Sequence, residues 1–410
     1  MSVDYNPFDP ATIEDPYPVY RELREAAAVH HLEAFGMWAV CRYDDVVAVL
    51  RDPKLFSSAD GWGRIFMQVL GRDFIYGQGE GRNILAADPP VHTRIRKTVN
   101  RAFTPKMIQS WEPQVRAIVD EILDEVEAKA EEGPVDIAAD CFALFPVTVI
   151  AVILGVERER RAEFNQWTID LLAGLSMFAD AAKVEYASNA LGEYLGPVVE
   201  HRRDHPGDDI VSMLVTNGSD GEDPLSFHEM VGFATMLLLA GAETTSNMLS
   251  NWLAAVIARP ELEAQLVADR SLVFPSIEEL FRYDPVTQMV WRAPTEDVEI
   301  GGVAVPKGEI LAVMLGSSNR DESKWGADAA EFRIGREIGG NNLVFGTGPH
   351  VCLGAHLARL EMRVMIEQLL DRFTSFKAAG PAVRSPNFML RGLHSLPVQM
   401  DVKKIASASW

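Results

Sequence analysis

The chain has 410 residues, of which 48% are hydrophobic, so it can bury a substantial core. Its formal net charge of −21 at pH 7 argues against nucleic acid and anionic membranes as partners. The three cysteines, Cys41, Cys141 and Cys352, lie far apart and indicate no disulfide framework, so we expect a reducing, cytoplasmic setting.

The N-terminus begins with the polar run Met1-Ser2-Val3-Asp4-Tyr5 and shows no pattern of a signal peptide or anchor. The most apolar run, residues 142–156, contains Pro146 and is shorter than the roughly 20 residues that a transmembrane helix needs. We therefore expect a buried helix at this run and a protein that does not insert into a membrane.

The first predicted elements are a short strand over Gly36–Cys41 and a helix over Tyr43–Leu50. Helical periodicity then covers most of the chain, over Ile108–Lys129, Asp140–Leu154, Arg158–Met177, Ala182–Arg203, Ser226–Ala258 and Leu353–Phe373. Strand-like segments gather late, at Val298–Ile300, Ile310–Leu315 and Met389–Met400. The pattern predicts a mainly α (α+β) fold, a helix-rich body with small peripheral sheets. No linker, charge block or repeat divides the chain, so we expect a single domain over residues 1–406.

The segment 88–97 begins a helix with prolines in its first turn. His92 and Arg96 stand four residues apart and therefore share one face of that helix. Arg94 and Lys97 fall on other faces, where we expect them to be exposed.

The longest predicted helix begins at a capping box, Ser226 to Glu229, and ends before Pro260. It is almost wholly apolar from Met230 to Ala242, and Glu243, Thr244 and Thr245 follow. An acid and a hydroxyl in a buried helix are costly unless their polarity is used. The plain alternative is a solvated glutamate beside threonines that hydrogen-bond back to their own helix.

A third motif is Glu279-Leu280-Phe281-Arg282. Glu279 and Arg282 are spaced i,i+3, which in isolation is typical of an ordinary surface pair.

The most informative stretch is Phe345-Gly346-Thr347-Gly348-Pro349-His350-Val351-Cys352-Leu353-Gly354, which runs into the last long helix. A thiolate just before a helix receives amide N–H groups and the positive end of the helix dipole. The glycines let the backbone pass close to a flat group. Such a thiolate suits the axial position of a haem iron. A lone cysteine beside glycines is otherwise more often an inert packed residue.

Every fixed position of Phe-Gly-x-Gly-x-His-x-Cys-x-Gly is filled, and the chain resembles the cytochromes P-450, the haem-thiolate monooxygenases. Four motifs occur in the family's order, at residues 88–97, 240–245, 279–282 and 345–359. The resemblance covers nearly the whole chain. It implies the triangular, helix-rich cytochrome P-450 fold, haem b as cofactor, and a soluble bacterial-type enzyme. Such an enzyme inserts one oxygen atom from O2 into a C–H or C=C bond.

The resemblance also assigns the haem contacts. Cys352 would ligate the iron, Phe345 would shield the sulfur, and Gly346 and Gly354 complete the motif. The donors expected for the two haem propionates are His92, Arg96, Arg292 and His350.

On the oxygen side of the haem, the resemblance implies that Ala240 and Gly241 open a bulge in the long helix. Thr244 would hold a water and Glu243 would feed protons toward the oxygen, although many relatives have Asp where this chain has Glu. The Glu279–Arg282 pair would be buried and would lock the haem-side core, with Arg336 as the best candidate for its further partner.

The expected substrate pocket is mainly apolar and suits a terpenoid, steroid, fatty acid or alkylated aromatic. The residues predicted to line it are Trp62, Phe66, Leu239, Val286, Met289, Phe388 and Met389. Electrons would come from NAD(P)H through a ferredoxin reductase and a ferredoxin. Lys97, Arg101 and Lys106 could form a positive dock for an acidic ferredoxin, or simply be scattered solubilising charges.

Two alternatives belong to other functional classes. A haem-thiolate sensor or electron-transfer protein would not need the Glu243–Thr244 pair. Peroxide-driven relatives lose the acid–threonine pair, so its presence favours a monooxygenase that uses oxygen and electrons. We expect a monomer, and Ser407-Ala408-Ser409-Trp410 look like an added tail outside the domain.

Overall fold

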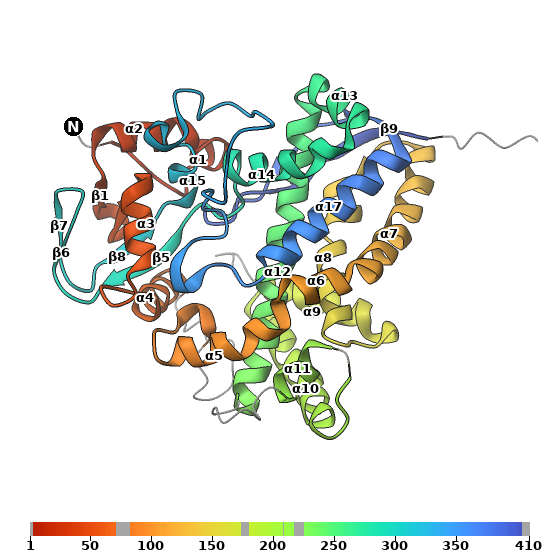
Figure 1. Ribbon diagram of the computed structural model, residues 1–410, viewed down its shortest axis with the longest axis horizontal. Helices are drawn as coiled ribbons and strands as arrows, with labels where there is room; N and C mark the ends of the chain where they lie inside the picture. Colours follow the sequence, from red (N-terminus) through yellow and green to blue (C-terminus); the bar gives the residue numbers. More distant parts are fainter. Residues whose placement is uncertain (1–2, 71–82, 174–179, 208, 217–224, 404–410) are drawn as a thin grey trace, which may run out of the picture.

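The computed structural model describes residues 3–70, 83–173, 180–207, 209–216 and 225–403. Figure 1 shows a larger helical part on one side and a smaller part, built around a twisted sheet, on the other. The long helix α12, Phe227–Ile257, runs between them through the molecule. The mainly α (α+β) prediction is confirmed.

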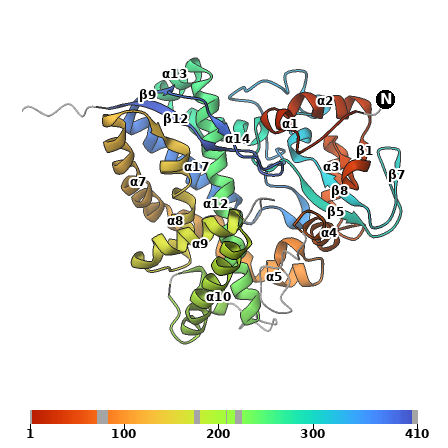
Figure 2. The same cartoon turned by 180° about the vertical axis from the view of Figure 1, so that it is seen from behind.

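The helical part packs around α12, as the view from behind also shows (Figure 2). Its other helices are α6 (Pro105–Ser110), α7 (Glu112–Glu132), α8 (Phe145–Ile153), α9 (Arg161–Ala173), α10 (Ala181–Asp204), α11 (Ile210–Thr216), α13 (Pro260–Ala268), α14 (Val273–Tyr283) and α17 (Ala355–Arg372).

The capping box predicted for α12 is present. The Ser226 hydroxyl accepts a hydrogen bond from the Glu229 N–H at 3.2 Å, and the Glu229 carboxylate accepts one from the Ser226 N–H at 2.8 Å. This reciprocal pair satisfies two amides at the helix start and fixes where α12 begins.

The other part centres on a five-stranded sheet of order β1-β2-β8-β5-β3. Its strands are β1 (Val29–Leu32), β2 (Met37–Val40), β8 (Ile310–Val313), β5 (Val290–Pro294) and β3 (Phe56–Ser57). The β2–β8 pair is parallel, with Met37 opposite Ile310, and the other pairs are antiparallel. The helices of this part are α1 (Pro10–Glu14), α2 (Tyr17–Ala26), α3 (Tyr43–Arg51), α4 (Ser58–Leu70), α15 (Leu315–Ser318) and α16 (Glu322–Trp325).

Three small sheets complete the described fold. They are β4-β12-β9 (Val135–Asp136, Pro397–Val402, Phe373–Ala378), β6-β7 (Val298–Ile300, Val303–Val305) and β10-β11 (Val383–Arg384, Leu393–Ser395). The helix α5, Val91–Asn100, and the short turn Arg101–Phe103 lie between the two parts of the chain.

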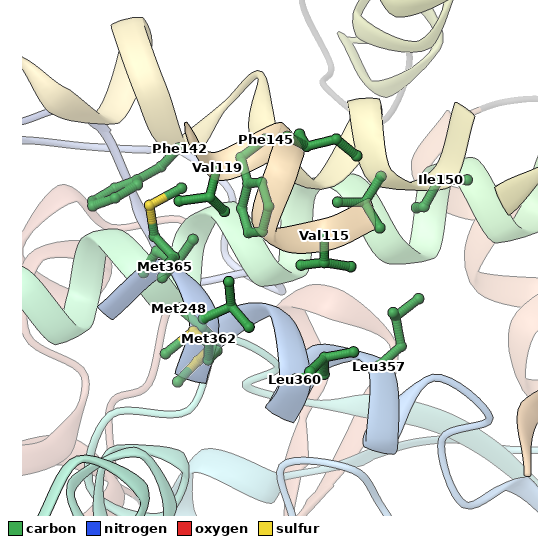
Figure 3. Close-up of a cluster of buried hydrophobic side chains, with 14 of the residues drawn as sticks. Val115, Val119, Phe142, Phe145, Ile150, Met248, Leu357, Leu360, Met362 and Met365 are labelled. Carbon is green, nitrogen blue, oxygen red and sulfur yellow. The ribbon is translucent and has the colours of Figure 1, made fainter. Parts of the chain in front are cut away.

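The largest buried cluster joins α7, α8, α12 and α17 (Figure 3). Val115, Phe145, Met248, Leu360 and Met365 are among its members, and their side chains fill the space between these helices. This packing fixes α17, and with it the cysteine loop that precedes it, against α12.

The differences from the predicted elements have local causes. The helix predicted over Ile108–Lys129 is divided at Trp111, because Pro113 lies in the first turn of α7. Pro146 likewise lies in the first turn of α8, and the start of the helix predicted from Asp140 is instead part of a short π-helix, Ala138–Phe142. The segment predicted to be a strand from Ile310 to Leu315 ends at Val313 and turns into α15. In the described part of the chain no helix is both long enough and apolar enough to cross a membrane.

Candidate functional site

A cavity lies between α12, the loop before α17 and the start of α5. Most of the side chains that line it are apolar. The predicted residues on its wall are Ala240, Gly241, Thr244, His92, Arg96, Arg292, Phe345, Gly346, His350, Cys352 and Gly354. The cavity therefore brings together segments that lie more than 250 residues apart in the sequence.

The cysteine loop is held in one conformation by its glycines. Gly348 has a φ of +74°, and a Cβ at this position would lie 2.5 Å from the carbonyl oxygen of Leu50. Gly346 also has a positive φ, +66°. The Cys352 N–H donates to the Phe345 carbonyl at 2.8 Å, which closes the loop and directs Cys352 toward the cavity.

The Cys352 side chain is exposed to the cavity rather than packed in the core. Burial beneath the protein surface raises the pKa of its thiol, while the Gly354 N–H and the guanidinium groups of Arg96 and Arg359 act in the opposite direction. The helix α17 begins at Ala355, after Cys352, with Gly354 at its cap. The expected contact between the thiol and an amide N–H, that of Gly354, is present, but its effect on the pKa of Cys352 is smaller than that of burial. A metal cation at the sulfur would favour the thiolate.

Four nitrogen-bearing side chains crowd one side of the cavity. The His92 and His350 rings lie 4.0 Å apart, and the buried Nε2 atom of each has no hydrogen-bond partner among the described residues. Burial lowers the pKa of both histidines, and the nearby Arg96 and Arg292 lower the pKa of His350 further. Burial also lowers the pKa of Arg292 to about 10.

Asp88, the acid whose charge acts on His92 and Arg292, is already engaged. The Asp88 carboxylate accepts hydrogen bonds from the Ser57 hydroxyl at 2.5 Å and from the Ser58 N–H at 2.8 Å. Unpaired donors beside buried cations need an anion, and two histidines and two arginines suit a pair of carboxylates.

On the side of the cavity opposite the cysteine loop, α12 continues past the cavity as an unbroken helix. The Thr244 hydroxyl donates to the Ala240 carbonyl at 2.7 Å, and Thr244 lines the cavity. A Cβ on Gly241 would lie 2.3 Å from the Ile150 Cδ1 atom, so this glycine admits α8 close to α12. The expected bulge at Ala240 and Gly241 is not present in this structure.

Glu243 is half-buried and is not among the residues that line the cavity. Burial raises the pKa of its carboxyl group to about 7, against the effect of the Asn247 and Asn387 side chains. Glu243 can therefore gain and lose a proton near neutral pH, one residue from Thr244.

Glu361 is a buried acid that our reading of the sequence missed. It lines the cavity from α17, and burial raises the pKa of its carboxyl group to about 8, while Thr245 acts in the opposite direction. Its Oε1 atom has no hydrogen-bond partner in the described structure. The sequence carries no clear signal for it, because Arg359 and Arg363 flank Leu360-Glu361-Met362.

Comparison with known proteins identifies the family. The family model described as Cytochrome P450 matches residues 35–401. The chain belongs to the cytochromes P-450. It is 35% identical over 405 residues to cytochrome P-450 107B1 of Saccharopolyspora erythraea, with 96% of each chain covered.

Solved structures of this family have the same fold. CYP109Q5 from Chondromyces apiculatus matches with a TM-score of 0.89 and 35% identity, covering 98% of this chain and 100% of that one. CYP109E1 from Bacillus megaterium, in complex with testosterone, matches with a TM-score of 0.83 and 32% identity, covering 94% and 99%.

Cytochromes P-450 are monooxygenases that bind haem b, and this chain is an enzyme of that kind. The cavity fits the cofactor: the two orphaned histidine Nε2 atoms and the buried Arg292 suit haem propionates. Cys352, the cavity-facing thiol opposite α12, is the residue that could hold the iron.

The cytochrome P-450 core next to this site contains a buried charge network. Arg282 donates to both oxygens of Glu279, at 2.9 and 2.7 Å, and both side chains are fully buried. Arg336 reaches Glu279 at 3.3 Å, where the sequence suggested it would. The remaining Arg282 donors bond the carbonyls of Asn319, Ala329 and Glu331, so every charge in the network has partners.

Of the residues predicted to line a substrate pocket, several lie on the wall of this cavity. Trp62, Leu239, Val286, Met289 and Met389 line the cavity. Phe388 does not line the cavity, so its predicted place there is wrong. The centroid of its ring lies 4.6 Å from that of Phe8 and 6.3 Å from that of Trp291. The Phe66 side chain lies outside the described residues. Other residues on the cavity wall, which the sequence did not indicate, include Ile84, Leu85 and Phe233.

Proposed function

We propose that this cytochrome P-450 oxidises a C–H or C=C bond of a small to medium-sized apolar molecule. The substrate class is a terpenoid, steroid, fatty acid or alkylated aromatic. The observation that carries the proposal is one cavity with Cys352 on its wall, Thr244 on α12 and a predominantly apolar lining. The CYP109E1 complex with testosterone supports the steroid member of this class.

When bound, haem supplies the activation of O2 and the transfer of one oxygen atom to the substrate. In this proposal the Cys352 thiolate holds the iron, and the Phe345 ring beside it limits the access of water. His92, Arg96, Arg292 and His350 bind the two propionates. The buried, unpaired Nε2 atoms of His92 and His350 support this role, and a dianionic partner would offset the positive charge of the neighbouring Arg96 and Arg292.

The proton needed for oxygen activation is assigned to Glu243 and Thr244. The Thr244 hydroxyl donates a hydrogen bond to the Ala240 carbonyl, so its oxygen lone pairs can accept a hydrogen bond from a water in the cavity. Glu243, with a pKa of about 7, can supply a proton to that water through a small side-chain movement.

The substrate would be held mainly by shape and apolar contact. Leu239, Met289 and Met389 come from three different segments, α12, the stretch before β5 and the stretch before β11, and meet at the cavity. Thr287 adds a hydroxyl to this wall and can bind one polar group of a substrate.

Electrons are proposed to pass from NAD(P)H through a ferredoxin reductase and a ferredoxin. Lys97 on α5, Arg101 just after it and Lys106 on α6 are all exposed and follow one another along the chain. A positive patch on a protein of net charge −21 would steer an acidic ferredoxin to this face. We further propose a cytoplasmic monomer with a single domain over residues 1–406.

The first test is the absorption spectrum of the dithionite-reduced, CO-treated protein, for wild type and Cys352→Ala. The thiolate-type Soret band in wild type alone supports Cys352 as ligand. A band typical of imidazole ligation, or one that the substitution leaves in place, would contradict it.

The second test is turnover with NAD(P)H, ferredoxin and reductase compared with turnover on peroxide alone. Turnover that depends on NAD(P)H, reductase and ferredoxin supports the proposed partner. The double variant Lys97→Glu with Arg101→Glu should weaken this turnover and leave substrate binding unchanged. Efficient turnover on peroxide alone would favour a peroxygenase.

A further inference from the structure

Arg359 on α17 lies against an aromatic ring of the cysteine loop. Its guanidinium carbon is 4.5 Å from the centroid of the Phe345 ring and 5.7 Å from that of Phe281. The two rings meet edge to face, with their centroids 5.0 Å apart. Both rings and Cys352 line the cavity, whereas Arg359 is not among the lining residues. The cation therefore contacts the far side of an aromatic pair whose other side faces the thiol-bearing cavity.

Glu278 on α14 fixes the guanidinium group in this place. Arg359 donates from Nε to the Glu278 Oε1 atom at 2.6 Å and from Nη2 to Oε2 at 3.2 Å, a bidentate ion pair. Its Nη1 atom donates to the Ala355 carbonyl at 3.2 Å. The Asn342 Nδ2 group also donates to Glu278, at 3.3 Å. Each guanidinium nitrogen thus has a partner, which holds the side chain in one orientation.

The same ring is joined to Cys352 through the backbone. The Cys352 N–H donates to the Phe345 carbonyl at 2.8 Å, and α17 begins three residues after Cys352. Arg359 therefore contacts the loop at its start, through the ring, and belongs to the helix at its end. Its charge also acts on the Cys352 thiol in the direction that favours the thiolate.

The ion pair is largely withdrawn from water. The Arg359 side chain is 23% exposed and the Glu278 side chain 15%. Charges in such a setting are screened much less by salt than charges in open solvent. Each member of the pair can therefore change the electrostatic potential at the cysteine loop, and the two members act in opposite directions.

We propose that Arg359 is a positioning residue: it fixes the Phe345 ring at the cysteine loop and, with Glu278, sets the reduction potential of the iron in the holoenzyme. This rests on the proposed role of Cys352 as the iron ligand. Groups around a ligating sulfur, and their charge, tune the potential of the metal that it holds. A cation there favours the reduced, less positive iron, and an anion opposes it.

The test uses holoenzyme variants that change this charge in opposite directions. Arg359→Met keeps an unbranched side chain on the ring but removes the cation and leaves Glu278 unpaired. Glu278→Gln keeps the shape of the acid but removes its charge and leaves the guanidinium group unpaired. The midpoint potential of each substrate-free holoenzyme is measured by reductive titration, followed in the absorption spectrum.

Arg359→Met should lower the potential and Glu278→Gln should raise it. Each should shift the ratio of ferrous to ferric iron by a factor on the order of ten, which is about 59 mV for one electron. The double variant should return toward wild type, because both charges are then absent. Arg359→Lys keeps the charge without the planar fork and should lie between wild type and Arg359→Met.

Any other combination of signs in the two single variants would overturn the inference. A purely structural role would shift both potentials in the same direction or leave both unchanged. If Arg359→Met binds too little haem to be titrated, Glu278→Gln decides: a raised potential supports the inference, and an unchanged or lowered one overturns it.

Arg363→Met is the matched control. Arg363 lies one turn further along α17, is 27% exposed and pairs with Glu112 of α7 at 2.7 Å. The variant removes the same charge from an ion pair of similar exposure and should move the potential less than Arg359→Met does. An equal shift would mean that net charge alone sets the potential, which contradicts a particular role for Arg359.

The CO spectrum of the same proteins separates this inference from the proposed function. If all variants have the thiolate-type Soret band but lack the opposed shifts, the role of Arg359 is wrong and Cys352 remains the ligand. If wild type has a band typical of imidazole ligation, the proposed function fails at Cys352, and the role of Arg359 falls with it.

Discussion

The two sides of the cavity are built differently. On the cysteine side, particular atoms are required: Gly348 avoids the Leu50 carbonyl, Arg282 satisfies Glu279, and His92 and His350 place unpaired nitrogens at the cavity. On the substrate side, residues such as Leu239 and Met289 contribute volume and apolar surface. The cysteine side therefore tolerates few residue types at each position, whereas the substrate side can exchange one apolar residue for another.

The largest effect is expected from Arg282→Ala. It leaves the fully buried Glu279 without its main partner, which costs about 3–5 kcal/mol of the free energy of unfolding and prevents haem incorporation. Urea unfolding and the haem content of the purified protein measure this. The matched control is Glu25→Gln in the exposed Arg21–Glu25 pair, where the change should stay below about 1 kcal/mol. Equal losses of stability at the buried and the exposed pair would contradict this prediction.

The next largest effect is expected from Gly348→Ala. The residue has a φ of +74° and a methyl group would meet the Leu50 carbonyl at 2.5 Å, so the loop must move, at a cost of about 1–3 kcal/mol. The thiolate-type CO spectrum should weaken together with the thermal midpoint. Gly63→Ala, at a helical glycine with open space around it, should leave both unchanged or slightly raise the midpoint. An unaffected spectrum in Gly348→Ala would show that the loop is not constrained.

Glu361→Gln should change how the stability of the protein depends on pH. Its folded pKa of about 8 lies above the ordinary value of 4.5, so the folded state binds the proton more tightly. The free energy of unfolding should therefore fall as pH rises from about 4.5 to 8, by at most about 1.4 kcal/mol per pH unit from this group. The variant should lose that slope and match wild type most closely in acid. Parallel unfolding curves across this range would refute the buried, protonated acid.

The smallest effect on stability is expected from Met289→Leu on the substrate wall. A volume-conserving apolar exchange should cost less than about 1.5 kcal/mol and leave the CO spectrum intact. The spin-state response to a panel of apolar ligands should change instead. Phe388→Leu, outside the cavity, should leave that ligand ranking as it is. A ranking altered equally by both variants would mean that packing rather than contact sets selectivity.

The sequence predicted the cysteine side well because backbone geometry there requires particular residue types, which leave a readable motif. It could not separate Phe388 from Met389, since both are apolar neighbours and only the loop conformation decides which one turns to the cavity. The burial of Glu361 could not be predicted either, because it depends on the packing of α12 over α17, which no local pattern shows. Arg94, expected to be exposed, is partly buried and pairs with Glu229 at the start of α12, a contact between segments far apart in the chain.

Gly61 on α4 lies directly on the backbone of Arg292 in β5, where a Cβ would come within 2.5 Å of the Arg292 Cα atom. Trp62, its neighbour, lines the cavity. Under the proposed role of Arg292 in binding a haem propionate, a library that randomises α4 to change the selectivity of this enzyme also alters its cofactor loading. A library in which residue 61 stays glycine can explore new substrates, whereas one that varies it would select first for variants that still retain haem.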